Sequence, residues 1–201
     1  MPGGSHRGPR VSPGRSAGSE GDALNLTLEQ VQEAFYAELL SVPFHEHLGV
    51  ALDRSAAPGE PRVTIPPKPE IVTADGQHSV AAVYTLGEAA SAIEMADEVA
   101  PRALELGMGA IFFTVSARFV PRGPATGTIG AITRLVSGLD EKAGEGKASR
   151  KATVEVAAEV VGEGGTMVGE QRFGFYVRFT DLSRMRGMVR PASEVGRLVG
   201  P

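Results

Sequence analysis

The residue in this chain that is best suited to a chemical role is a glutamate set among apolar residues. Residues 80–93 are apolar or small, with three polar exceptions at a spacing of three, Thr85, Glu88 and Ser91. In a helix this spacing places the three side chains roughly along one stripe. A carboxylate in such surroundings costs free energy unless it is paired, solvated or used in chemistry. Glu88 is therefore the first candidate for an acid–base or nucleophilic role.

A solvated stripe is the plainer interpretation of the same pattern. Glutamates within helices are most often simply exposed. Glu94 continues the spacing of three, as a solvated face would. The pattern by itself leaves both interpretations open.

The residues just before this stretch are suited to start a helix. Ser79 can act as the N-cap, and Asp75-Gly76 supplies a turn shortly before it. His78 lies directly ahead of the cap. A histidine in that place is more often a cap or surface residue than a catalyst.

The remaining elements must enclose this helix, which we expect to end near Asp97 or to continue brokenly towards Pro101. A first helix is predicted from Thr27, with a capping box to Gln30, and Pro43 stops it. Alternation and turn residues predict strands over residues 50–54, 62–65, 111–120, 125–136, 150–161 and 167–179. A helix that is apolar on most sides needs a sheet curled around it, so the sequence predicts an α+β fold.

The strand over residues 111–120 has a clear alternation of side chains. Ile111, Phe113 and Phe119 are predicted to face one side of the sheet. Thr114 and Arg118 are predicted to face the other side.

Composition predicts one domain with two appendages. Residues 1–22 are rich in Gly, Ser, Pro and Arg and are predicted to be a disordered tail. We expect a single domain over residues 23–180 and a peripheral tail over 181–201. The absence of cysteine excludes disulfides and thiolate sites. With no signal peptide and no apolar run of about 20 residues, we expect a cytoplasmic protein without a membrane partner.

Charge points away from nucleic acid, because the net charge is -4 and the basic residues at the two ends hide a more acidic centre. One segment departs from this trend, since residues 118–151 contain seven lysines and arginines, including Arg118, Arg122, Lys147 and Arg150. This local excess would suit a phosphate-bearing small molecule. Solvated side chains at strand ends and in loops explain it equally well.

A metal site is not predicted. His45 and His47 flank Glu46, but residues two apart in a short segment rarely form a site without further ligands. The sequence shows no such ligands nearby.

The order of these elements, with certain short motifs, resembles the hotdog-fold acyl-CoA thioesterase superfamily, and more narrowly its phenylacetyl-CoA thioesterase-like members and their uncharacterised relatives. The resemblance covers residues 42–179, and it depends on the order and spacing of several weak motifs. These motifs are Pro43-Phe44, Leu48-Gly49, Asp75-Gly76, Tyr84-Thr85-Leu86-Gly87-Glu88, Phe119-Val120-Pro121 and Gly127.

The resemblance implies a hotdog fold, in which an antiparallel sheet of five to six strands wraps around one long central helix. It also implies that Glu88 is the acid that acts as general base or nucleophile on a thioester. Such proteins commonly open the helix with a His-Gly-Gly run nine residues before the acid. Here that place is held by Ser79, followed by Val80 and Ala81, and His78 stands one position early. Either the register shifts by one residue or Ser79 replaces the histidine.

The resemblance further implies the surroundings of the reaction. Backbone N–H groups at the helix start, at Val80 and Ala81, would stabilise the oxyanion next to the turn at Asp75-Gly76. Hotdog proteins pair two central helices, so Thr85 or Ser91 of a second subunit would position water. The phosphates of CoA would contact the basic residues Arg118, Arg122, Lys147 and Arg150. The expected partners are an acyl-CoA or acyl-carrier thioester and a second copy of the chain, as a dimer or dimer of dimers, with no cofactor beyond the CoA of the substrate.

Two other functions remain open. The missing His-Gly-Gly run favours a non-catalytic acyl-binding or interaction protein that keeps the fold. A dehydratase-type hotdog enzyme would need an active-site histidine near the central helix, and only His78 is available for it.

Overall fold

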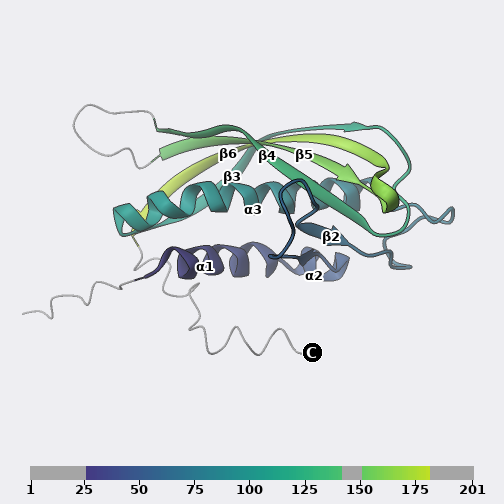
Figure 1. The fold of residues 1–201 in the computed structure, drawn as a ribbon, viewed down its shortest axis with the longest axis horizontal. Helices are drawn as coiled ribbons and strands as arrows, with labels where there is room; N and C mark the ends of the chain where they lie inside the picture. The colour runs from purple at the N-terminus through teal and green to yellow at the C-terminus, as the bar shows by residue number, and fades with distance from the viewer. Residues whose placement is uncertain (1–25, 142–150, 182–201) are drawn as a thin grey trace, which may run out of the picture.

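The structure, a computed structural model, describes residues 26–141 and 151–181 (Figure 1). In chain order the elements are α1 (Leu28–Leu40), α2 (Pro43–Leu48), β1 (Ala51–Leu52), β2 (Val63–Ile65), α3 (Val80–Leu106), β3 (Met108–Pro121), β4 (Ile129–Glu141), β5 (Lys151–Val161), a 3-10 turn η1 (Glu163–Gly165) and β6 (Met167–Asp181). The predicted tail over residues 1–22 lies outside the described residues, as does nearly all of the tail over 181–201.

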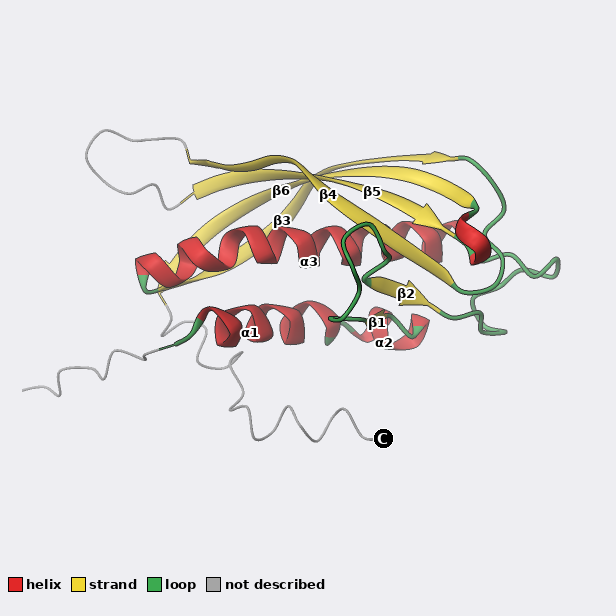
Figure 2. Ribbon diagram, in the orientation of Figure 1, coloured by secondary structure: helices red, strands yellow, loops and turns green. Residues whose placement is uncertain are grey.

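The six strands form one antiparallel sheet in the order β1-β2-β4-β5-β6-β3. The sheet curls over one side of α3, and α1 lies along the opposite side (Figure 2). The α+β fold with a single long central helix is therefore confirmed. Among the residues described, no helix is both long and apolar enough to cross a membrane.

Small residues let α3 lie close to both of its neighbours. Its alanines at positions 82, 89, 90, 96, 100 and 103 are all nearly inaccessible to solvent. Larger side chains, including Leu86, Ile93 and Met95, are buried between them. Burial on several sides explains why this helix shows no simple apolar stripe in the sequence.

The ends of α3 follow from local chemistry, except at Pro101. The Ser79 hydroxyl accepts the Ala82 N–H at 3.2 Å, so Ser79 is the N-cap as predicted. The helix continues through Pro101 to Leu106, beyond both predicted ends. Proline removes one helical hydrogen bond, and the buried residues Val99 and Ala103 on either side hold the helix in place. Gly107, with φ 59°, ends it in the left-handed conformation.

The first helix is fixed at its start by the predicted capping box between Thr27 and Gln30. A polar cluster joins it to α3, in which the Asp97 carboxylate accepts hydrogen bonds from Gln32, Tyr36 and Arg62. Burial and the hydrogen bond to Asp97 raise the pKa of Tyr36 to about 12. This cluster connects α1, α3 and β2.

The side chains of β3 do not alternate as predicted. The register with β6 shifts between Thr114 and Ser116, which marks an irregularity in the ladder. Before the shift, Phe112 and Thr114 face α3, whereas Ile111 and Phe113 face outward. The prediction that Ile111 and Phe113 share a face with Phe119 is therefore wrong, because one extra residue reverses the alternation.

Candidate active site

The side chain of Glu88 emerges from the first half of α3 towards β3. Its Oε1 accepts a hydrogen bond of 3.0 Å from the Thr114 hydroxyl. Its other carboxylate oxygen has no hydrogen-bond partner within the described part of the chain, and the side chain is half-buried. Burial and the negative charge of Glu88 together raise the pKa of Tyr84, one turn earlier on the helix.

Glu88 lies on the wall of a cavity of about 240 Å³ between α3, the sheet and the joint of α1 and α2. Most of the lining is apolar and includes Leu39, Val42, Ala92, Met95, Phe112 and Phe175. The polar side chains in the lining are Glu88, Thr114 and His45. An apolar cavity with a few polar groups is the usual form of a small-molecule site.

Sequence reasoning missed the contact of Thr114 with the site, and it also missed that of His45. His45 lies in α2, and its Nδ1 is 2.8 Å from the carbonyl oxygen of Leu39. Because a carbonyl only accepts, Nδ1 carries a proton, and Nε2 of the neutral ring is left as an acceptor. From the sequence alone, His45 is only a possible metal ligand, because no local pattern indicates that α2 packs against α3.

The start of α3 lies well away from Glu88 of the same chain. Nine residues separate Ser79 from Glu88, which corresponds to about 13 Å along the helix axis. Ser79 is engaged as the cap, whereas Val80 and Ala81 are exposed. Neither the predicted oxyanion donors nor Ser79 line the cavity at Glu88.

His78 is almost completely buried, with 5% of its surface exposed, and it does not line the cavity either. Its Nε2 donates to the carbonyl oxygen of Gly127 at 2.7 Å, and its backbone N–H donates to Ala125. Nδ1 has no partner among the described residues. These contacts hold the loop before β4 against the start of α3.

The predicted turn at Asp75-Gly76 is present ahead of the helix. Gly76 has φ 76°, and its N–H donates to the carbonyl oxygen of Thr73 at 2.8 Å. A hydrogen bond from the Thr73 hydroxyl holds the pKa of the Asp75 carboxyl below its usual range. Both turn residues are exposed, and neither reaches the cavity.

Thr85 and Ser91 are buried, with 6% and 0% of their surfaces exposed. The interpretation of positions 85, 88, 91 and 94 as one solvated stripe is therefore wrong, because positions 85 and 91 are covered. The Ser91 hydroxyl has no hydrogen-bond partner in the described ranges, which leaves a buried polar group with unused capacity.

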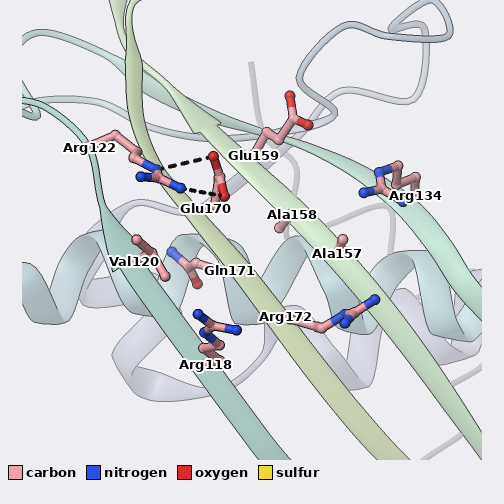
Figure 3. Close-up of a pocket in the computed structure, with 10 residues that line it drawn as sticks. All are labelled: Arg118, Val120, Arg122, Arg134, Ala157, Ala158, Glu159, Glu170, Gln171 and Arg172. Carbon is pink, nitrogen blue, oxygen red and sulfur yellow. Dashed lines mark hydrogen bonds and ion pairs between the residues drawn. The ribbon is translucent and has the colours of Figure 1, made fainter.

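The structure separates the predicted phosphate contacts from Glu88. Arg118 and Arg122 lie on the outer face of the sheet, away from α3 (Figure 3). Lys147 and Arg150 lie outside the described residues. No group of three or more potential metal ligands lies together in residues 26–141 and 151–181.

Comparisons with known proteins agree with this fold. No protein-family model matches the chain, and no curated protein matches its sequence. Solved structures do match, at low sequence identity. A probable thioesterase from Pseudomonas aeruginosa is 19% identical, with a TM-score of 0.52 over 77% of this chain and 97% of its own.

Two further structures give the same result. A thioesterase-superfamily protein is 19% identical, with a TM-score of 0.50 over 74% of this chain and 98% of its own. The E. coli PaaI protein of the phenylacetic acid degradation operon is 10% identical, with a TM-score of 0.50 over 76% of this chain and 96% of its own. The chain therefore has the hotdog fold found in thioesterase-superfamily proteins.

Proposed function

We propose that this protein hydrolyses an acyl thioester, carried by CoA or by an acyl carrier, with Glu88 as the reacting carboxylate. One observation carries the proposal. A carboxylate on the central helix, held by Thr114, forms the polar part of an otherwise apolar cavity. The occurrence of the same fold in proteins described as thioesterases supports the assignment.

The cavity would hold the acyl group with its carbonyl carbon beside Glu88. In one route the carboxylate accepts a proton from water, and the hydroxide adds to the carbonyl carbon. The tetrahedral oxyanion then collapses, the carbon–sulfur bond breaks, and the thiolate leaves and takes up a proton. In the other route the carboxylate itself adds to the carbonyl carbon, the carbon–sulfur bond breaks and the thiolate leaves. Water then cleaves the resulting anhydride, which releases the acid and restores the Glu88 carboxylate.

The oxyanion needs hydrogen-bond donors, and residues 26–141 and 151–181 of the same protomer do not place backbone donors of the helix start beside Glu88. The N–H groups at Val80 and Ala81 are too distant along the helix. We therefore place the α3 start of a partner subunit at this point, in a homodimer whose cleft lies between two copies. Thr85 and Ser91 are buried within their own protomer, so we do not assign them the positioning of the attacking water.

The edge of β3 is where the two copies would meet. β3 pairs with β6 on one side, and its other edge is unpaired within the described residues. Two of its side chains, Phe113 and Val115, are 52% and 63% exposed. A long apolar edge strand is a natural place for pairing with another chain.

The direct test replaces Glu88 with glutamine and measures thiol release from short, medium and aromatic acyl-CoAs. Glu88→Gln keeps the shape and the Thr114 hydrogen bond but removes the base, so turnover should fall at least about a hundredfold. The matched control is Glu94→Gln. Glu94 lies on the same helix and accepts an equivalent 3.0 Å hydrogen bond from Thr133, but it does not line the cavity. If Glu88→Gln releases thiol as fast as Glu94→Gln, Glu88 is not the reacting carboxylate.

A non-catalytic acyl-binding protein is the second candidate. The observation in its favour is at the helix start, where the His-Gly-Gly run is missing and Ser79 acts as the helix cap. This candidate predicts tight acyl-CoA binding to the wild-type protein with no thiol released.

A further inference from the structure

The outer face of the sheet has a row of arginines. Arg118 on β3 lies directly opposite Arg172 on β6, and Arg172 in turn lies opposite Ala157 on β5. Ala157 is paired with Arg134 on β4, so one row across four strands holds three arginines and one small residue. Like charges directly opposite one another disfavour the sheet, so this row has an electrostatic cost.

The neighbouring carboxylates neutralise only part of this charge. Arg172 forms an ion pair with Glu155 at 2.9 Å, and Arg122 forms a two-pronged pair with Glu170 at 3.1 Å (Figure 3). Arg118 and Arg134 have no hydrogen bond or ion pair with any described residue. Two guanidinium groups therefore remain available for an anion.

The short side chain of Ala157 leaves a hollow of about 540 Å³ between the arginines. Its lining includes four arginines and two glutamates, namely Arg118, Arg122, Arg134, Arg172, Glu159 and Glu170. Figure 3 shows α3 on the far side of the sheet from it. Arg172 and Arg134 are two strand spacings apart, which is about 10 Å between their backbones. Side chains of this length can converge on one small ligand from both sides.

We propose that this hollow binds a free phosphorylated small molecule bearing a diphosphate group, at a site separate from the cavity beside Glu88. Guanidinium forks match phosphate oxygens two at a time, and a diphosphate offers one phosphate to each side of the hollow. The site is on the opposite face of the sheet from Glu88, so its ligand is not the thioester that occupies the cavity. This inference does not rest on the proposed hydrolysis.

The flanking carboxylates favour a compact ligand over an extended one. Glu159 and Glu170 lie in the row on one side of the arginines, and Glu155 lies in the row on the other side. A nucleic acid, an acidic protein surface or an anionic membrane would overlie these carboxylates and be repelled. A diphosphate is small enough to lie against the arginine row, although Glu159 and Glu170 also line the hollow.

Inorganic pyrophosphate is the probe, titrated into the full-length protein by calorimetry at low ionic strength. We expect saturable binding that Arg134→Ala and Arg118→Ala each weaken by about tenfold or more. The matched control is Arg178→Ala. Arg178 is exposed on the same face of β6, six residues from Arg172, and outside the hollow. Its removal should change the dissociation constant by less than about twofold.

Several results would overturn the proposal. If Arg178→Ala weakens binding as much as the other two substitutions, pyrophosphate is attracted by the general positive charge of this face and not by a defined site. If pyrophosphate does not bind at all, the proposal is wrong. A change in oligomeric mass on Arg134→Ala would identify the row as an interface between copies. Arg134→Ala could also raise the KM for an acyl-CoA but not for the matching pantetheine thioester, which lacks the phosphates of CoA. That result would show that the arginine row binds the phosphates of the substrate. Glu88→Gln should bind pyrophosphate normally, which separates this test from that of the hydrolysis.

Discussion

At the scale of single residues, the proposed hydrolysis depends on how the Glu88 carboxylate is held. One oxygen accepts a hydrogen bond from Thr114, and the other has no partner among the described residues. Glu94, two turns further along α3, makes the same kind of bond to Thr133 and lies near Arg62 at 3.9 Å. The two glutamates therefore accept similar hydrogen bonds from a threonine, but Glu88 lines the cavity and Glu94 lies near an arginine.

Replacing Thr114 with valine should lower the turnover number by about tenfold while the protein stays folded. Valine has the same shape as threonine but cannot donate the hydrogen bond that orients the Glu88 carboxylate, and a bond to a charged group is worth about 1.5–3 kcal/mol. Thiol release under saturating acyl-CoA measures the effect. Thr133→Val removes the corresponding bond to Glu94 and should leave turnover within about twofold. If both variants lose activity equally, the Thr114 bond has no special part in orienting Glu88.

At the scale of elements, α3 and β6 are locked together at a single glycine. A methyl group at Gly87 would overlap the carboxamide of Gln171, which is buried and donates to the Val83 carbonyl oxygen at 2.8 Å. The glycine is thus required by the close approach of a strand side chain to the helix. Glycine is present here even though it has a lower helix propensity than alanine.

Gly87→Ala should therefore destabilise the protein by about 1–2 kcal/mol, even though alanine favours a helix by about 1 kcal/mol. The loss comes from displacing the buried carboxamide from its partner. In a Gln171→Ala background the same substitution should become stabilising by about 1 kcal/mol, because the overlap is gone and only the helix propensity remains. Urea unfolding of the four proteins measures this cycle. The same destabilisation in both backgrounds would show that Gln171 does not cause it.

At the scale of the whole molecule, the two faces of the sheet differ in the side chains that they present. The inner face packs on α3 and contributes Thr114 to the cavity, whereas the outer face carries the arginine row. The edge of β3 that faces away from β6 pairs with no strand in the described ranges, and Phe113 and Val115 beside it are exposed. Such an edge is suited to pairing with another chain. We place a second copy there.

The double substitution Phe113→Lys and Val115→Lys should shift the protein towards a monomer of 21.0 kDa, because charge at the strand edge prevents pairing. Light scattering after size exclusion gives the mass, and thiol release should fall with it. Leu28→Lys, at a residue 39% exposed on α1, should leave the mass of the assembly unchanged. A wild-type protein that is already monomeric and fully active would rule out the shared cleft.

Prediction from the sequence succeeded where local chemistry decides the structure. The capping box at Thr27, the Ser79 cap and the turn at Gly76 each depend on residues within a few positions of one another. It failed at the middle of β3, because an irregularity reverses the alternation and is set by pairing with β6. It also failed at the end of α3, where packing of Val99 and Ala103 outweighs Pro101.

The sequence by itself determined the order of the main strands and of the two longer helices and made Glu88 a candidate, since composition and periodicity act along the chain. It did not predict α2. Only the tertiary structure brought Thr114 and His45 to Glu88 and carried Arg118 and Arg122 to the opposite face of the sheet. These contacts join residues far apart in sequence. They depend on strand register and on the docking of α2, which no local pattern records.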